Sequence, residues 1–114
     1  MSEFEISTEI LESGIVLITP SGYLDAHTFE QMESTIEEFF ENDQHRMIVN
    51  LAQVNYISSA GAGVFIGALS QAHENEGNII FLNPSSNVQD VFDILGLTQI
   101  FSFASEVDDA LKMF

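Results

Sequence analysis

A chain of 114 residues, 46% of them hydrophobic, has the size and apolar content of one domain with a single core, so we predict one domain over residues 1–114. Eighteen acidic residues stand against two basic ones, and a net charge of −16 argues against direct binding to nucleic acid or anionic membrane. The acidity either attracts basic protein partners or only maintains solubility, for example in a salty habitat. With no cysteine, no N-terminal signal-peptide pattern and no apolar run of about 20 residues, we expect a cytoplasmic protein without disulfides or membrane insertion.

The N-terminal residues have the pattern of an antiparallel hairpin. Apolar and polar residues alternate over positions 4–11, and positions 15–18 form a continuous apolar run. Ser13-Gly14 between them is a turn signal, so we expect two paired strands. The second strand is expected to end at Pro20-Ser21-Gly22, because proline and glycine interrupt regular structure.

Positions 28–43 have the pattern of an amphipathic helix. Thr28 is the expected N-cap, and Gln31 three positions later completes a capping box. Apolar side chains then recur at helical spacing through Phe40, with glutamates on the opposite face. We predict that this helix ends near Asn42-Asp43.

The second half of the chain alternates between short apolar runs and helical patterns. Buried strands are predicted at positions 47–51 and 78–82, and a short edge strand at positions 100–103. Between the first two strands, we expect a loop over positions 52–57 and a helix over positions 63–72.

Two further helices complete the predicted order. Ser86 or Asn87 is expected to cap one that stops at Gly96, and Ser105 with Asp108 is expected to cap the last. The order β-β-α-β-α-β-α-β-α predicts an α/β fold, a small single domain with a mostly parallel central sheet, one antiparallel edge strand and about four helices. Functional residues are then expected in loops at the carboxyl ends of strands.

Metal and acid–base sites have weak support in this sequence. His27, His45 and His73 lie far apart, and no acidic stretch has the ligand spacing of a calcium loop, so we predict no metal site. A hydrolase with a pair of carboxylates has abundant acids to draw on, but no pair is distinguished from the others.

The glycines near Ser59 match two catalytic or cofactor motifs only in part. A nucleophile elbow requires Gly-x-Ser-x-Gly, and here Gly61 fits while Ile57 stands at the first glycine. Gly61, Gly63 and Gly67 resemble a dinucleotide fingerprint, but the third glycine is one residue late. We favour the alternative that these glycines let the helix pack closely on the sheet, and we predict neither an enzyme nor a bound cofactor.

Ser58 and Ser59 stand just before this helix. The first N–H groups of a helix lack internal partners and carry partial positive charge, so a phosphate is stabilised there. Phosphorylation of Ser59 would add roughly −1.5 to −2 charges and present a bulky anion to a partner fitted to a hydroxyl. The residues alone leave two interpretations open, a plain N-cap by either serine and a phosphorylation switch.

Four stretches of the chain, in order and with the right spacing, resemble the STAS domain family and, within it, the stand-alone bacterial anti-sigma factor antagonists. Ser58-Ser59-Ala60-Gly61-Ala62-Gly63-Val64 falls on the family signature Asp-Ser-Ser/Thr-Gly-Leu-Gly-Val. Positions 22–28 are similar to the Gly-x-Leu-Asp motif before the first helix. Positions 48–57 resemble the central strand and its loop, and positions 92–101 resemble the closing helix with its Gly-Leu and Ile-Phe pattern.

The resemblance implies a phosphorylation-switched antagonist. Such a protein binds an anti-sigma factor serine kinase, so that a sigma factor is released, and a regulator serine phosphatase resets it. The matching phosphorylated residue is Ser59, with Ser58 as a fallback acceptor. The switch-site neighbours that the resemblance implies are Asp25, Ala60, Gly61 and Gly63.

The chain departs from the family pattern at several positions. Ser58 replaces the family aspartate, Ala60 and Ala62 replace a hydroxyl residue and a leucine, and Asn50 stands where an aspartate is common. The alternative function is therefore a STAS scaffold or a small-ligand (nucleotide) binding module in another signalling complex, without a serine switch. Exposed phenylalanines near the first helix or the C-terminus would support a homodimer.

Overall fold

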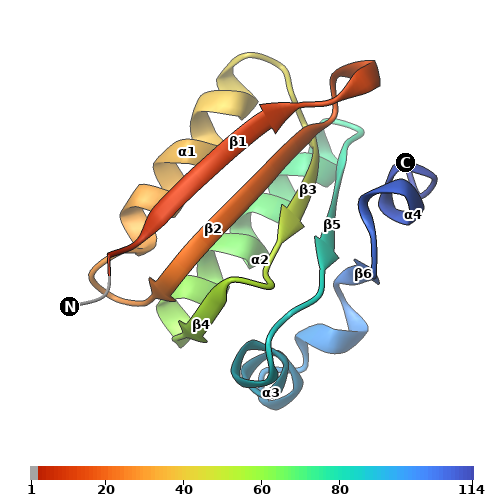
Figure 1. Ribbon diagram of the computed structural model, residues 1–114. Helices are drawn as coiled ribbons and strands as arrows, with labels where there is room; N and C mark the ends of the chain where they lie inside the picture. Colours follow the sequence, from red (N-terminus) through yellow and green to blue (C-terminus); the bar gives the residue numbers. More distant parts are fainter. Residues whose placement is uncertain (1–2) are drawn as a thin grey trace.

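A six-stranded sheet organises the chain (Figure 1). The computed structural model describes residues 3–114. Within the sheet the strands follow the order β1-β2-β3-β5-β6, and β4 pairs with β2 outside this path. The strands and helices are β1 (Glu5–Ile10), the 3₁₀ turn η1 (Glu12–Gly14), β2 (Val16–Leu24), α1 (Phe29–Glu41), β3 (Arg46–Asn50), β4 (Val54–Ile57), α2 (Ser59–Glu74), β5 (Asn78–Leu82), α3 (Ser86–Ile94), the 3₁₀ turn η2 (Leu97–Gln99), β6 (Ser102–Ala104) and α4 (Val107–Leu111).

The direction of the strands confirms the predicted fold class. β1 and β2 form an antiparallel pair, in which Glu5 lies opposite Ser21 and Ile10 opposite Val16. The pairs β2–β3, β2–β4, β3–β5 and β5–β6 are parallel. Along the described residues four α-helices connect or follow these strands, as the hydrophobic pattern predicts.

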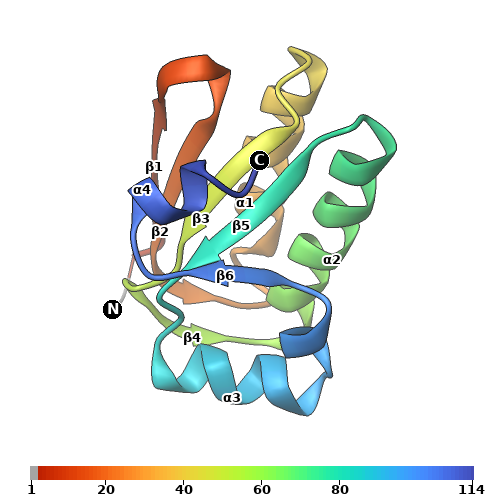
Figure 2. The same cartoon turned by 90° about the vertical axis from the view of Figure 1, so that its right-hand side faces the viewer.

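The two faces of the sheet support hydrophobic cores of different size. Helices α1 and α2 cover one face, and α4 lies against the other (Figures 1 and 2). Met47 and Val49 of β3 enter the larger core, whereas Ile48 between them enters the smaller core beside Ala110 of α4. Successive side chains of a strand point to opposite faces, so a strand covered on both faces is apolar at every position.

Phenylalanines form the centre of the larger core. The buried ring of Phe81 stacks on Phe101 at 4.6 Å between centroids and meets Phe65 edge-on at 5.2 Å. Phe29 and Phe39 of α1 are half-buried and pack against this core. The first helix therefore does not present the exposed phenylalanines that would support a homodimer, whereas Phe114 at the C-terminus is exposed as that expectation requires.

Strand β2 is longer than the sequence predicts, because it continues through Pro20 and Gly22 to Leu24. Its parallel partner changes along its length, from β3 at positions 16–18 to β4 at positions 22–24. Pro20 lies between these two segments and faces only β1, so its missing N–H does not interrupt a parallel ladder. Gly22 has a φ of +109° at a register shift, and a Cβ there would lie 2.8 Å from the Glu3 carbonyl oxygen.

The predicted loop over positions 52–57 is wrong over its last four positions, where Val54–Ile57 forms β4. The following helix also begins earlier than predicted, at Ser59 rather than residue 63, and runs to Glu74. Both differences have one cause. The extended end of β2 provides a free edge, and once β4 pairs with it the chain enters α2 directly at the strand end.

Three predicted helix caps are not formed. Thr28 stands at the N-cap position of α1 as predicted, but its hydroxyl makes no cap bond to the helix and instead donates to the Tyr23 carbonyl oxygen at 2.7 Å. Helix α3 has Ser85 rather than Ser86 or Asn87 at its N-cap, and α4 has Glu106, each without a side-chain cap bond. The predicted pair Ser105 and Asp108 therefore forms no cap, because α4 begins at Val107 and its N-cap position falls on Glu106, one residue after Ser105.

Candidate functional site

The candidate site lies where β2 and β4 end side by side. Leu24 and Ile57 are the paired last residues of the two parallel strands. The carbonyl oxygen of Leu24 accepts a hydrogen bond from the N–H of Ser58 at 3.0 Å, which extends the ladder by one residue. This bond brings Asp25 and Ser58, the residues that follow the two strands, to the same edge of the sheet.

Ser58 and Ser59 have different roles at the start of α2. Ser58 is the half-buried N-cap: its Oγ accepts from the Gly61 N–H at 3.3 Å, and its carbonyl oxygen accepts from the Ala62 N–H at 2.9 Å. Ser59 is the first helical residue and is exposed. The prediction of a serine at the helix start is confirmed, but Ser59 lies in the helix rather than before it, and the cap is Ser58.

Gly61 fixes the position of this helix start. A Cβ at Gly61 would lie 2.6 Å from the Leu24 carbonyl oxygen and 2.8 Å from the Leu24 Cγ, closer than packed atoms approach one another. The expected close packing of a glycine on the sheet is therefore confirmed at Gly61. It is wrong at Gly63 and Gly67, where a Cβ would meet no atom outside its own stretch of helix within 4 Å.

Asp25 begins a tight turn between β2 and α1. Its Oδ1 accepts from the His27 N–H at 2.9 Å, and the Thr28 hydroxyl accepts from the Asp25 N–H at 2.9 Å. The Asp25 carbonyl oxygen also accepts from the Phe29 N–H at 2.9 Å. The half-buried Asp25 thus holds the turn beside the serine pair. Two residues earlier, the ring of Tyr23 on β2 lies 5.9 Å, centroid to centroid, from the ring of Tyr56 on β4.

The start of α3 holds β4 from the other side, which sequence reasoning missed. The Ser85 hydroxyl donates to the Val54 carbonyl oxygen at 2.7 Å, and the Asn87 Oδ1 accepts from the Ile57 N–H at 3.2 Å. The sequence shows that Ser85 and Asn87 are polar residues at the start of a helix. Their spacing does not reveal that they bond to β4 instead of capping α3.

The three histidines differ in their relation to the serine site, because His27 stands in the turn that Asp25 begins whereas His45 and His73 lie elsewhere. Over residues 3–114, no group of three His, Cys, Asp or Glu side chains is arranged to hold a metal ion. His73 Nε2 pairs with the Asn78 side chain at 3.1 Å, and the His45 ring stacks on Phe40, so neither histidine belongs to the serine site. Ala60 is half-buried and Gly63 is exposed in the first turns of α2, beside Ser59.

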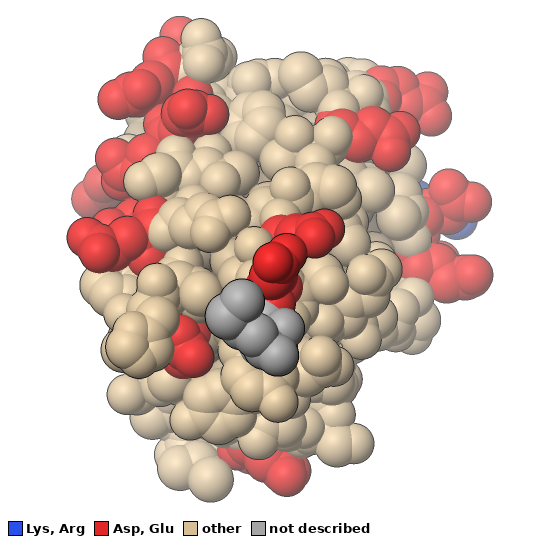
Figure 3. Space-filling model, turned by 60° about the vertical axis from the view of Figure 1, so that its left-hand side comes forward, with Lys and Arg blue, Asp and Glu red and all other residues tan. Residues whose placement is uncertain are grey.

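Acidic residues dominate the charged surface. On the face shown in Figure 3, Asp and Glu side chains appear around the rim and near the centre. Glu3 lies just before β1, and β1 and α1 together carry seven further carboxylates: Glu5, Glu9, Glu30, Glu33, Glu37, Glu38 and Glu41. No helix in the described part of the chain combines the length and the apolar character that crossing a bilayer requires.

Comparisons with known proteins match almost the whole chain. A family model described as the STAS domain matches residues 6–110. An "Anti-sigma-B factor antagonist" of Staphylococcus epidermidis is 34% identical over 79 residues, which are 69% of this chain and 73% of that protein. The protein with the same description in Staphylococcus aureus is 29% identical over the same shares.

Solved structures have the same fold. The Bacillus cell fate determinant SpoIIAA in its phosphorylated form has a TM-score of 0.75 and 26% identity, covering 96% of this chain and all of that one (100%). An anti-sigma factor antagonist from Mycobacterium paratuberculosis has a TM-score of 0.85 over 97% of this chain and 93% of the other. Its 18% identity makes it evidence for the fold alone.

Proposed function

Since this chain belongs to the STAS domain family, we propose that it is an anti-sigma factor antagonist whose binding is switched by phosphorylation of Ser59. In its unmodified form it binds an anti-sigma factor in the cytoplasm, and the sigma factor held by that protein is released. The anti-sigma factor is also the serine kinase, and a regulator serine phosphatase restores the unmodified form. No catalytic step is assigned to this chain.

One observation carries the choice of Ser59. Of the two adjacent serines, Ser58 is half-buried and its hydroxyl oxygen caps α2, whereas Ser59 is exposed at the first position of the helix. A kinase can reach Ser59 without breaking the cap, while a phosphate on Ser58 would disrupt the bond to Gly61. Ser58 therefore becomes the fallback acceptor only if the helix start opens.

The helix start also explains how a phosphate would act. Partial positive charge at the N-terminus of α2 favours an anion on Ser59, so modification does not require the domain to unfold. Gly61 packs against Leu24 and holds this end of the helix in place. The added charge and bulk therefore act on the partner, whose surface must otherwise fit against a neutral hydroxyl.

The relatives support this proposal in their own descriptions. The Staphylococcus epidermidis protein is described as an anti-sigma-B factor antagonist, and SpoIIAA, 26% identical, has been solved in a phosphorylated form. Ser58 in place of the family aspartate favours the second candidate, a STAS module that binds its partner or a nucleotide without a serine switch.

A binding experiment separates the two candidates. We expect the wild-type chain to bind its anti-sigma factor, and Ser59→Glu to weaken that binding by more than about tenfold, because a carboxylate enters the contact surface. Ser7→Glu is the control, since it adds the same charge at an exposed position of β1, outside helix α2. Calorimetry that gives one affinity for wild type and both variants would favour the module without a switch.

A further inference from the structure

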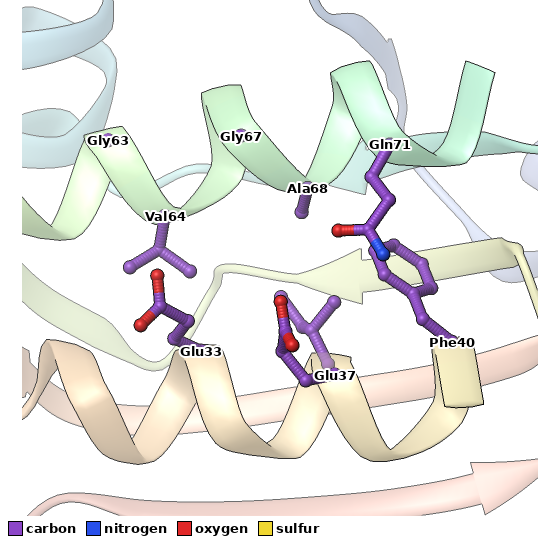
Figure 4. A pocket seen from close by; sticks show the side chains of 9 residues that line it. Glu33, Glu37, Phe40, Gly63, Val64, Gly67, Ala68 and Gln71 are labelled. Atoms are coloured by element: carbon purple, nitrogen blue, oxygen red, sulfur yellow. The ribbon is translucent and has the colours of Figure 1, made fainter. Parts of the chain in front are cut away.

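A groove runs between α1 and α2 on the surface of the domain (Figure 4). Its volume is about 140 Å³, enough for part of one long side chain. Ile36, Val64 and Ala68 form an apolar floor, and the side chains of Glu33, Glu37 and Gln71 provide polar groups along it. The groove therefore combines an apolar surface with carboxylates and a side-chain amide.

On the α2 side of this groove, two of the lining residues are glycines and carry no side chain. Gly63 and Gly67 line it from the exposed side of α2, four residues apart. Glycine inside a helix is destabilising, and the fold gives no compensating reason here, because a Cβ at either position would meet no atom outside its own helical stretch. Gly61, by contrast, is required by its contact with Leu24. The two glycines therefore leave room for another molecule to approach the backbone of α2 closely.

The charge of the groove selects the chemistry of what approaches. Glu33 and Glu37 are one helical turn apart on the same face of α1, and Figure 4 shows both carboxylates directed toward α2. The protein carries a net charge of −16, so its surface as a whole attracts basic partners. A lysine or arginine fits both parts of the groove, since its methylene stem packs on apolar surface while its charged end reaches a carboxylate.

The groove is continuous with the proposed switch. Ser59, Gly63 and Gly67 follow one another at intervals of four residues, which places each above the next along one side of a helix. All three are exposed. A partner that covers Ser59 at the start of α2 would extend over the two glycines and reach the acidic side of α1.

From these observations we infer that the α1–α2 groove receives a basic segment of the anti-sigma factor, which inserts a lysine or arginine side chain between Glu33, Glu37 and the Gly63–Gly67 wall. This inference rests on the proposed function and adds a second contact region to it. Ser59 controls whether the partner stays bound, and the groove supplies affinity and selects a basic surface.

Filling the groove tests the steric part of this inference. Gly67→Gln adds a neutral side chain to the wall, and glutamine is a good helix former, so the variant is expected to fold and to melt at a higher temperature than wild type. Its affinity for the anti-sigma factor is expected to fall by about tenfold, since the added side chain occupies the partner's place. Ser34→Gln introduces the same residue at an exposed position of α1 that does not line the groove, and it should bind as wild type does.

Neutralising the groove tests the electrostatic part. The double variant Glu33→Gln and Glu37→Gln is expected to bind about tenfold more weakly at low salt, with a smaller decrease in affinity when salt is added. The matched control, Glu38→Gln with Glu41→Gln, removes the same charge from exposed positions of α1 that do not line the groove. A loss confined to the first pair supports a specific basic contact.

The outcomes distinguish this inference from the proposed function. If wild type binds, Ser59→Glu does not, and both groove variants bind as wild type does, the groove inference is wrong while the switch stands. Equal losses in the groove pair and in the Glu38 and Glu41 pair would also overturn it, because the acidity would then act only through the overall field. If wild type itself fails to bind the anti-sigma factor, the proposed function fails and the inference fails with it.

Discussion

The start of α2 and the groove one turn further along the same helix differ in how their glycines are used. At the start, Gly61 lies against Leu24 with no room for a Cβ, and Ser58 closes the helix end. In the groove, Gly63 and Gly67 face open space. The comparison teaches that one helix combines a tightly fixed end, which holds Ser59 in place, with a low open wall that is free for recognition.

The largest expected effect on stability comes from substituting Gly61 at the tightly packed start of α2. Gly61→Ala places a Cβ 2.6 Å from a backbone oxygen, which cannot move aside as a flexible side chain can. We expect a loss of about 2–3 kcal/mol in the free energy of unfolding, measured by urea denaturation. An unchanged midpoint for this variant would contradict the tight packing of the helix start.

The two serines give the next effect. Ser58→Ala removes the oxygen that accepts from the Gly61 N–H, and we expect it to cost about 1 kcal/mol of stability. Ser59→Ala removes an exposed hydroxyl and is expected to change stability by less than about 0.5 kcal/mol. Equal losses in the same denaturation assay would mean that both hydroxyls serve the helix cap, and the distinction between them would fail.

A smaller change in stability, this time a gain, is expected at the two glycines of the groove. Gly63→Ala and Gly67→Ala should each raise the free energy of unfolding by about 0.5–1 kcal/mol, because alanine favours the helix and no atom obstructs its methyl group. Thermal unfolding followed by circular dichroism measures this gain. A loss of stability at either position would show that the wall is packed after all.

The smallest expected effect on stability comes from removing one of the two groove carboxylates. Glu33 and Glu37 repel each other across one helical turn, so Glu33→Gln is expected to stabilise the domain slightly at low salt. The gain should disappear as added salt screens exposed charges. Melting temperatures of wild type and variant at low and high salt provide the measurement, and a gain that persists at high salt would point to packing rather than repulsion.

Much of the fold follows from local patterns, and the exceptions have tertiary causes. The hydrophobic periodicity is enough to locate α1, β3 and β5, because their apolar positions repeat in register with the core. Strand β4 was not predictable in the same way: Asn55 and Tyr56 are exposed, and the strand exists because β2 continues past Pro20. A proline is a stop signal locally, and only the change of partner along β2 makes it harmless here.

The candidate site was predictable in position but not in detail. The signature around Ser59 and the strand–helix order indicate a serine at a helix start, which the structure confirms. Which serine forms the cap depends on where the helix begins, and that depends on the bond from Ser58 to Leu24 in another strand. The packing of Gly61 and the exposure of Gly67 likewise depend on neighbours that spacing in the sequence does not reveal.

The most direct measurement of the central claim is a map of the phosphorylated residue. The wild-type chain, Ser58→Ala and Ser59→Ala are each incubated with the anti-sigma factor kinase and ATP, and phosphate is located by mass spectrometry. We predict one phosphate on Ser59 in wild type and in Ser58→Ala, and none in Ser59→Ala. Phosphate on Ser58, or no phosphate on either serine of the wild-type chain, would contradict the assignment of Ser59 as the switch.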